Sequence, residues 1–171
     1  MDTNTLELFS RYNEEVNRKM NSFIEKLTRD QWERKFGGYF NSISRLCNHI
    51  YICDFNWLKR FSSLRPFEFV KKDLFRSNIA FTGLAVKNAK DYLAKRPELD
   101  DEINTFVTEL TDKDLLENLK YVDSHGNEHY RNFGGLVIHM FNHGTHHRGM
   151  ISLYLEEMGI ENDYSNLMDI V

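Results

Sequence analysis

Proline and glycine are scarce in this chain, whose 171 residues include only two prolines and nine glycines. Both residue types interrupt helices, proline because it lacks a backbone donor and glycine because of its conformational freedom. Their scarcity therefore favours long, uninterrupted helices. A chain of this length with 41% hydrophobic residues is long enough to build a core of its own. We expect residues 1–171 to form a single domain.

Long apolar runs and a strong charge of one sign are also missing. No stretch of about 18 apolar residues occurs, and residues 1–5 lack the basic and apolar regions of a signal peptide. We therefore expect a cytoplasmic protein without a membrane partner. The net charge is only −4, and no basic face interleaved with aromatic residues stands out, so nucleic-acid binding is not expected. Charge runs such as Asp100-Asp101-Glu102 are expected to be solvated helix faces.

Apolar residues that recur every three to four positions predict four amphipathic helices. We place them at about Thr5 to Leu27, Ser42 to Ser62, Phe81 to Leu110 and Asn132 to Met158. The third should bend or break near Pro97, and the last should stop near Gly159, a good C-cap residue. Tyr121 to Tyr130 has the pattern of a turn between two short extended segments. The four helices should close into a bundle, with the tail from Ile160 packed back or meeting a partner chain.

Histidine is concentrated in one part of the chain. Six of the seven histidines fall between His125 and His147, and four lie in the nine residues from His139 to His147. On a helix, residues three or four apart share a face, so two such imidazoles can bind one divalent metal. Three pairs qualify, and His143 belongs to each of them: with His139, with His146 and with His147. The ordinary alternative is that these are surface histidines or satisfied core histidines.

The stretch lacks two well-known metal motifs. It has no glutamate between its histidines, which disfavours the His-Glu-x-x-His arrangement of zinc proteases. It also lacks the paired Glu-x-x-His repeats of di-iron bundles. His125 and His129 are expected to be solvated loop residues. His49 stands alone on the second helix, where a core role is the ordinary interpretation, but a two-histidine site needs a third ligand.

Over most of its length the chain resembles the DinB/YfiT-like superfamily of metal-dependent enzymes. The segments that carry the resemblance are Arg11-Tyr12-Asn13, Gly37 to Ser42 leading into Asn48-His49-Ile50 and Trp57, Leu110 to Leu115, and His139 to Gly149. The last of them, with its Asn-His-x-x-His-His-Arg-Gly motif, is the specific one. The resemblance implies a four-helix bundle with a short extended or loop insertion before the last helix. It also implies a metal held by His49, His143 and His147.

The same resemblance implies a cytoplasmic protein, often a homodimer, that acts on a small molecule. Several members of the superfamily use low-molecular-weight thiols, as mycothiol-dependent isomerases and bacillithiol transferases do. The family usually continues its His-Arg-Gly motif with Gln, whereas this chain has Met150. A polar contact from that Gln at the pocket wall is therefore not expected here.

Three neutral imidazoles leave an open position on a divalent ion, which is typical of catalytic sites. Zinc and nickel are the expected ions, and iron and cobalt are also compatible. Three functions remain open: a thiol-dependent S-transferase or isomerase, a metal-dependent hydrolase, and a non-catalytic metal-binding or structural protein. The lack of an obvious general-base carboxylate near His143 slightly favours the first over the second.

Several residues near the predicted ligands are candidates for supporting roles. His146 and Arg148 are the candidate catalytic residues, and His139 and His146 are candidates to support the ligands or transfer protons. Arg148 is suited to hold a substrate carboxylate or to form an ion pair on the helix surface.

The two cysteines, Cys47 and Cys53, are six positions apart on one expected helix, which separates them by about 9 Å along its axis. They are too far apart for a disulfide, and free thiols fit a reducing compartment. Cys53 follows His49 by four residues and shares its face. It is a candidate fourth ligand or a thiol beside the metal, and packing as a small buried residue is the simpler interpretation.

Overall fold

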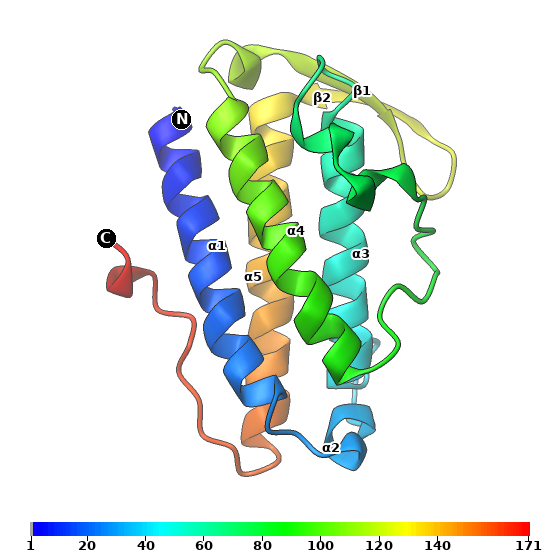
Figure 1. Ribbon diagram of the computed structural model, residues 1–171, viewed down its shortest axis with the longest axis vertical. Helices are drawn as coiled ribbons and strands as arrows, with labels where there is room; N and C mark the ends of the chain where they lie inside the picture. The colour runs from blue at the N-terminus through cyan, green and yellow to red at the C-terminus, as the bar shows by residue number, and fades with distance from the viewer. Residues whose placement is uncertain (1) are drawn as a thin grey trace.

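The structure, a computed structural model, describes residues 2–171 (Figure 1). Its four long helices are α1 (Thr3–Ile24), α3 (Ile43–Phe61), α4 (Ala89–Glu109) and α5 (Phe133–Glu156). A short helix, α2 (Arg29–Glu33), lies between α1 and α3, and an antiparallel hairpin of β1 (Asn118–Val122) and β2 (Glu128–Asn132) precedes α5. Short 3-10 turns occur at Phe69–Lys71, Asp73–Arg76, Asp114–Leu116 and Leu167–Asp169. The predicted all-α four-helix bundle with a short extended insertion before the last helix is confirmed.

Each long helix begins at a short polar side chain that accepts the backbone N–H three residues later, which satisfies one free donor of the first turn. The pairs are Asp2 and Thr5, Ser42 and Arg45, Asn88 and Asp91, and Asn132 and Gly135. At the end of α5, Gly159 adopts a φ of 75°. Its N–H donates to Glu156 O at 2.8 Å, and that of Ile160 to Leu155 O at 2.9 Å. This is a Schellman motif, which confirms the predicted stop at Gly159.

Helix α4 differs from the prediction in two ways. It begins at Ala89 and not near Phe81, because the side chain of Asn48 on α3 binds the preceding backbone in a non-helical form. The Asn48 Oδ1 accepts from the N–H groups of Ala85 and Val86 at 2.9 and 3.0 Å. Of the bend or break predicted near Pro97, the break is wrong, since Pro97 lies inside a continuous helix.

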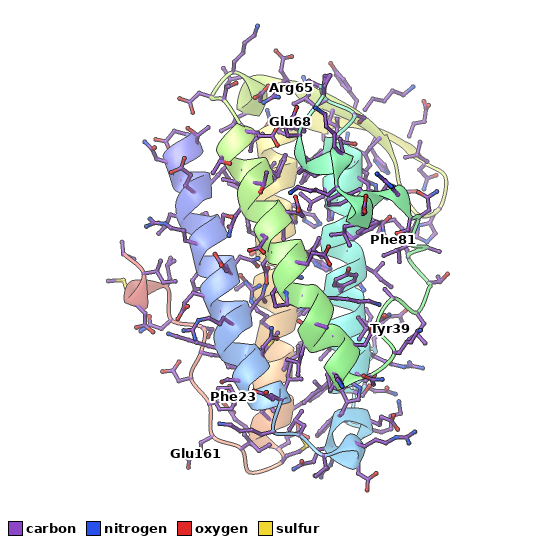
Figure 2. The ribbon with its side chains drawn as sticks, viewed as in Figure 1. Phe23, Tyr39, Arg65, Glu68, Phe81 and Glu161 are labelled. Carbon is purple, nitrogen blue, oxygen red and sulfur yellow. The ribbon has the colours of Figure 1, made fainter. Side chains whose placement is uncertain are left out.

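The connection from α3 to α4 crosses the surface from the hairpin end of the bundle, where Arg65 and Glu68 lie (Figure 2). Arg65 Nε donates to Asp114 Oδ1 at 3.0 Å. The backbone N–H of Glu68 donates to the Glu109 carboxylate at the end of α4, at 2.7 Å. The bond from Glu68 holds the first part of the connection at the C-terminal end of α4, whereas the connection itself leads into the N-terminal end of that helix.

The tail after α5 returns along α1 (Figure 1). The hydroxyl of buried Tyr164 donates to Arg148 O at 2.8 Å, and that of Tyr12 on α1 donates to Ser165 O at 2.6 Å. Of the two predicted alternatives for the tail, packing back on its own bundle is the one that the structure shows. None of the helices in residues 2–171 is both long and apolar enough to cross a membrane.

A pair of carboxylates and an arginine lie inside the bundle. Arg96 of α4 is fully buried and donates to Asp54 of α3 at 2.7 Å and, through Nε, to Asp100 one turn further along α4 at 3.1 Å. The prediction that Asp100 to Glu102 form a solvated face is wrong, because both Asp100 and Glu102 are buried. A charge pattern in sequence does not reveal that Arg96 supplies a partner inside the core.

Arg148 of α5 extends this network to α1. Its guanidinium is buried and donates to Asn13 Oδ1 at 2.6 Å and to Asn17 Oδ1 at 3.2 Å. Both amides in turn donate to Asp100, at 3.1 and 2.8 Å. Hydrogen bonds thus link α1, α3, α4 and α5 through side chains that are shielded from water.

Gly144 leaves room for this guanidinium. A Cβ built at Gly144 would lie 3.1 Å from Arg148 Nη1, closer than an ordinary contact. A glycine-to-alanine change in an open helix normally stabilises by about 1 kcal/mol. We expect Gly144→Ala to lower the free energy of unfolding by about 1–2 kcal/mol instead, because it displaces a buried, hydrogen-bonded charge. Urea denaturation measures this change.

Gly149 on the same helix is the matched control. It is exposed, and no atom lies within 4 Å of a Cβ built there. We expect Gly149→Ala to raise the free energy of unfolding by about 0.5–1 kcal/mol. A stabilising effect of both substitutions would show that Arg148 moves freely and is not held by Asn13.

Candidate metal centre

Three histidines meet between α3 and α5. His143 Nε2 lies 3.0 Å from His49 Nε2 and 3.1 Å from His147 Nε2. The ring centroids of His49 and His147 are 4.6 Å apart. The structure therefore brings together the three residues that the family resemblance indicated as ligands. That they bind a metal stays a prediction.

The positions of the three histidines on α3 and α5 explain why their rings lie together. His143 and His147 are four residues apart on α5 and share one of its faces. His49 stands on α3, which packs directly against α5. Of the pairs that the sequence left open, His143 with His147 is the one whose Nε2 atoms meet.

The Nε2 atoms of the three histidines cannot all be satisfied by hydrogen bonds to one another. A neutral imidazole nitrogen either donates or accepts along one direction in the plane of its ring. His143 Nε2 therefore cannot hydrogen-bond well to His49 and His147 at the same time. On the other edges of the rings, the Nδ1 atoms of His143 and His147 are buried and have no hydrogen-bond partner within residues 2–171. A cation shared by the three Nε2 atoms would satisfy all three lone pairs, so these residues fit a metal.

Burial keeps the three rings neutral. The pKa values of His49, His143 and His147 are lowered from 6.5 to about 4, first because burial disfavours the charged ring and then because neighbouring histidines repel its charge. At neutral pH each ring therefore carries a free lone pair, which is the state that a metal ligand requires.

Phe40 covers one side of the cluster. Its ring is stacked on that of His49 at 4.1 Å and meets the ring of His147 edge-on at 5.2 Å. The hydroxyl of Tyr154 on α5 lies 2.7 Å from Gly37 O and 2.8 Å from Phe40 O. These contacts hold the loop between α2 and α3, which carries Phe40, against the bundle. The sequence predicted no role for Phe40, although its segment carried part of the family resemblance.

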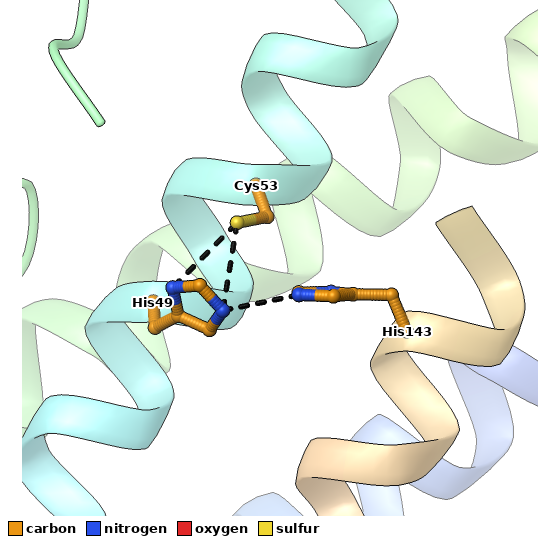
Figure 3. Close-up of side chains that lie close together, drawn as sticks. All are labelled: His49, Cys53 and His143. Carbon is orange, nitrogen blue, oxygen red and sulfur yellow. Dashed lines mark hydrogen bonds between the residues drawn. The ribbon is translucent and has the colours of Figure 1, made fainter. Parts of the chain in front are cut away.

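Cys53 lies on the next turn of α3 (Figure 3). Its Sγ is 3.6 Å from His49 Nδ1 and 3.7 Å from His49 Nε2. One ligand atom from each of His49, Cys53 and His143 fits within a mutual separation of 4.8 Å. Burial raises the pKa of the Cys53 thiol to about 12, with a further rise from Asp54. Cys53 and Cys47 are both free, as predicted.

His139 and His146 border the cluster. The exposed ring of His139 is 6.1 Å from that of His143 and 5.5 Å from Trp57. The ring of His146, also exposed, is 4.9 Å from that of His147. Beside His139 a shallow hollow of about 410 Å³ opens between α3, α5 and the hairpin, lined by Trp57, Tyr121, Arg131, Asn132, Gly135, Leu136 and His139.

The structure does not bring Arg148 to the cluster. Its guanidinium is turned toward α1 and donates to Asn13, Asn17 and, at 3.3 Å, to Thr145 Oγ1. An ion pair on the helix surface, one of its two predicted roles, is wrong because the side chain is buried. Its burial and its hydrogen bonds indicate a structural role.

His125 lies in the turn of the hairpin and His129 lies in β2. His125 is exposed, as predicted, whereas His129 is partly buried and its Nε2 pairs with Asp123 at 2.9 Å. The predicted turn between two extended segments is confirmed as the β1–β2 connection.

Comparison with known proteins agrees with this architecture. A sequence model of the DinB family matches residues 1–169 of the 171. No curated protein shows a significant match to the chain. The match includes all four long helices and the histidine cluster between α3 and α5. The chain therefore belongs to the DinB family.

Proposed function

We propose that the protein is a metal-dependent enzyme whose divalent ion is held by His49, His143 and His147. The observation that carries this proposal is the convergence of three neutral imidazoles, with Nε2 contacts of 3.0 and 3.1 Å around His143. Membership of the DinB family supports it. Zinc and nickel fit the donor set best, and iron and cobalt are also compatible.

The surroundings of the cluster suit a reaction on a small molecule. When bound, a divalent ion lowers the pKa of a coordinated water or thiol and polarises a carbonyl. Phe40 shields one side of the histidines from water. The hollow beside His139, whose ring is 6.1 Å from that of His143, has room for part of a substrate.

Within this proposal we favour a thiol-dependent S-transferase or isomerase. Metal-dependent hydrolases commonly use a carboxylate as the base that takes a proton from water. Within residues 2–171, the ligand atoms that gather here are those of imidazoles and a thiol. Asp54, next to Cys53 in the chain, is engaged by Arg96 inside the core. A substrate thiol is acidic enough to ionise without such a base, which favours thiol chemistry over hydrolysis.

The proposal is tested on protein purified without a metal-affinity tag. We expect about one equivalent of a transition metal. We also expect turnover of an electrophilic aryl halide that requires a low-molecular-weight thiol, with glutathione, bacillithiol and mycothiol each supplied in turn. Removal of the ion with a chelator should lower this rate by at least about 100-fold, since a Lewis-acid ion contributes several kcal/mol.

Two other outcomes distinguish the alternatives. Metal-dependent cleavage of esters or amides in the absence of thiol would identify a hydrolase. Failure to bind zinc or nickel, even after incubation with either ion, would overturn the metal-dependent enzyme and leave a structural role for the histidines.

A further inference from the structure

We propose that Cys53 is a fourth ligand, which binds the ion of the three-histidine centre as a thiolate. This inference rests on the metal centre proposed above and goes beyond it, because it adds a donor of a different chemical type. The sequence alone left Cys53 with several roles, of which packing was the simplest. The distances in the structure favour ligation.

The separations within the cluster are within a few tenths of an ångström of those between ligands of one ion. With bonds of about 2.0–2.1 Å to nitrogen and about 2.3 Å to sulfur, tetrahedral ligands lie about 3.3–3.4 Å apart for two nitrogens and about 3.5–3.6 Å apart for nitrogen and sulfur. The observed Nε2 separations are 3.0 and 3.1 Å, and Cys53 Sγ lies 3.7 Å from His49 Nε2. The sulfur is thus at the distance of a co-ligand.

The position of the sulfur relative to the His49 ring also favours ligation. A thiol that hydrogen-bonded to His49 would lie in line with one ring nitrogen. Cys53 Sγ is instead nearly equidistant from Nδ1 and Nε2, at 3.6 and 3.7 Å, so it sits beside the ring (Figure 3). Ligands of one ion point at the ion and not at one another. In Figure 3 the sulfur lies above the His49 ring, and His143 meets the same ring at Nε2 from the right.

A small movement of the sulfur brings it to the distance of a co-ligand from His143. The ligand atoms of Cys53 and His143 are at most 4.8 Å apart. Reaching the tetrahedral separation therefore requires a shift of at most about 1.3 Å, which rotation about the Cα–Cβ bond supplies. On binding, the S–H bond breaks, its proton passes to water, and a bond from sulfur to the metal forms. No oxidant or reductant takes part.

The added thiolate has two chemical consequences. It offsets one of the two positive charges of the ion, which suits a centre that is largely buried. It also shifts the preference toward zinc, since a soft sulfur donor among imidazoles selects zinc over harder ions. A substrate thiol offers the same donor atom as Cys53 and competes with it for this position.

Cobalt substitution tests the proposal directly. In the full-length protein loaded with Co²⁺, visible d–d bands report binding at the histidines, and a near-ultraviolet charge-transfer band reports a thiolate on the metal. We expect both in the wild type and expect Cys53→Ser to lose the charge-transfer band while it keeps the d–d bands. Zinc affinity, measured by competition with a chelator, should fall by at least about 10- to 100-fold, because the loss of outer-shell partners alone has effects of that size.

Cys47→Ala is the matched control. Cys47 lies on the same helix but is completely buried in the core. This variant should retain both sets of bands. Visible bands without a charge-transfer band in the wild type would overturn the role of Cys53 and leave the histidine centre intact. If no visible bands appear, or if they persist unchanged in His143→Ala, the histidine centre fails and the cysteine ligand fails with it.

Discussion

Arg96→Met is expected to lower the free energy of unfolding by about 3–5 kcal/mol, because it leaves two buried carboxylates without their counter-ion. Arg96 is fully buried and donates to Asp54 and Asp100, which are themselves buried. Burial raises the pKa of both carboxyl groups, and Arg96 opposes that rise. Methionine fills a similar volume, so the effect reports mainly the lost charge. Urea denaturation at neutral pH measures it.

The pH dependence of the free energy of unfolding of Arg96→Met shows whether the unpaired carboxylates cause its loss of stability. Without Arg96, the folded-state pKa values of Asp54 and Asp100 rise further above their unfolded values. The native variant then binds more protons than the unfolded chain, so its deficit in stability should shrink as the pH is lowered from neutral. Adding Asp54→Asn and Asp100→Asn to the variant should recover much of the loss at neutral pH, since both unpaired charges are gone.

Arg18→Met is the control for the removal of an arginine. Arg18 forms an exposed ion pair with Glu15 on α1, with an Nη2 to Oε1 distance of 2.6 Å. Removing it should change the free energy of unfolding by less than about 1 kcal/mol. Equal losses in Arg96→Met and Arg18→Met would contradict the importance of the buried network.

His143→Ala is expected to lower metal affinity by at least about 100-fold and so to abolish the metal content of the purified protein, because removing a ligand exceeds the effect of removing its outer-shell partners. His143 Nε2 lies within 3.1 Å of the Nε2 atoms of both His49 and His147, so its loss removes the ligand atom between them. Elemental analysis and competition with a chelator measure the effect.

His125→Ala is the control for the removal of a histidine, since His125 is exposed in the turn of the hairpin and is not part of the cluster. It should retain the metal content of the wild type. Undiminished metal in His143→Ala, or an equal loss in both variants, would show that the ion is bound elsewhere. Circular dichroism of each variant verifies that the bundle is folded.

The helices themselves could be largely predicted from the sequence. Three of the four long helices begin and end within three residues of the predicted bounds. Apolar periodicity and local capping determine such bounds, and both are visible in sequence, as at Ser42 and Gly159. These features depend on neighbours a few residues away, and this is why they could be predicted.

The predictions about the fold that were wrong concern features that depend on contacts between distant segments of the chain. The start of α4 is set by Asn48, which binds a backbone segment 37 residues further along. Helix α4 continues through Pro97, and Arg96 directly before it is bound by Asp54 of α3. The burial of Asp100 and Arg148 depends on partners from other helices. No pattern within one helix reveals such partners.

The candidate metal centre likewise has parts that could be predicted from the sequence and parts that could not. The spacing of His143 and His147 on one helix could be predicted, and the family resemblance added His49 from another. Phe40 has no chemical signature in sequence, so its place over the histidines could not be foreseen. The distances that distinguish Cys53 from an ordinary buried cysteine exist only in the folded bundle.

The centre joins His49 to His143, which is 94 residues away in the chain, so it exists only when α3 and α5 are packed together. By mass action, a ligand that binds the native state and not the unfolded chain adds to stability. At a free ion concentration 100 times its dissociation constant, the gain is about 2.7 kcal/mol. If the proposed ion binds there, metal scarcity would shorten the lifetime of this protein in the presence of proteases, independently of any effect on catalysis.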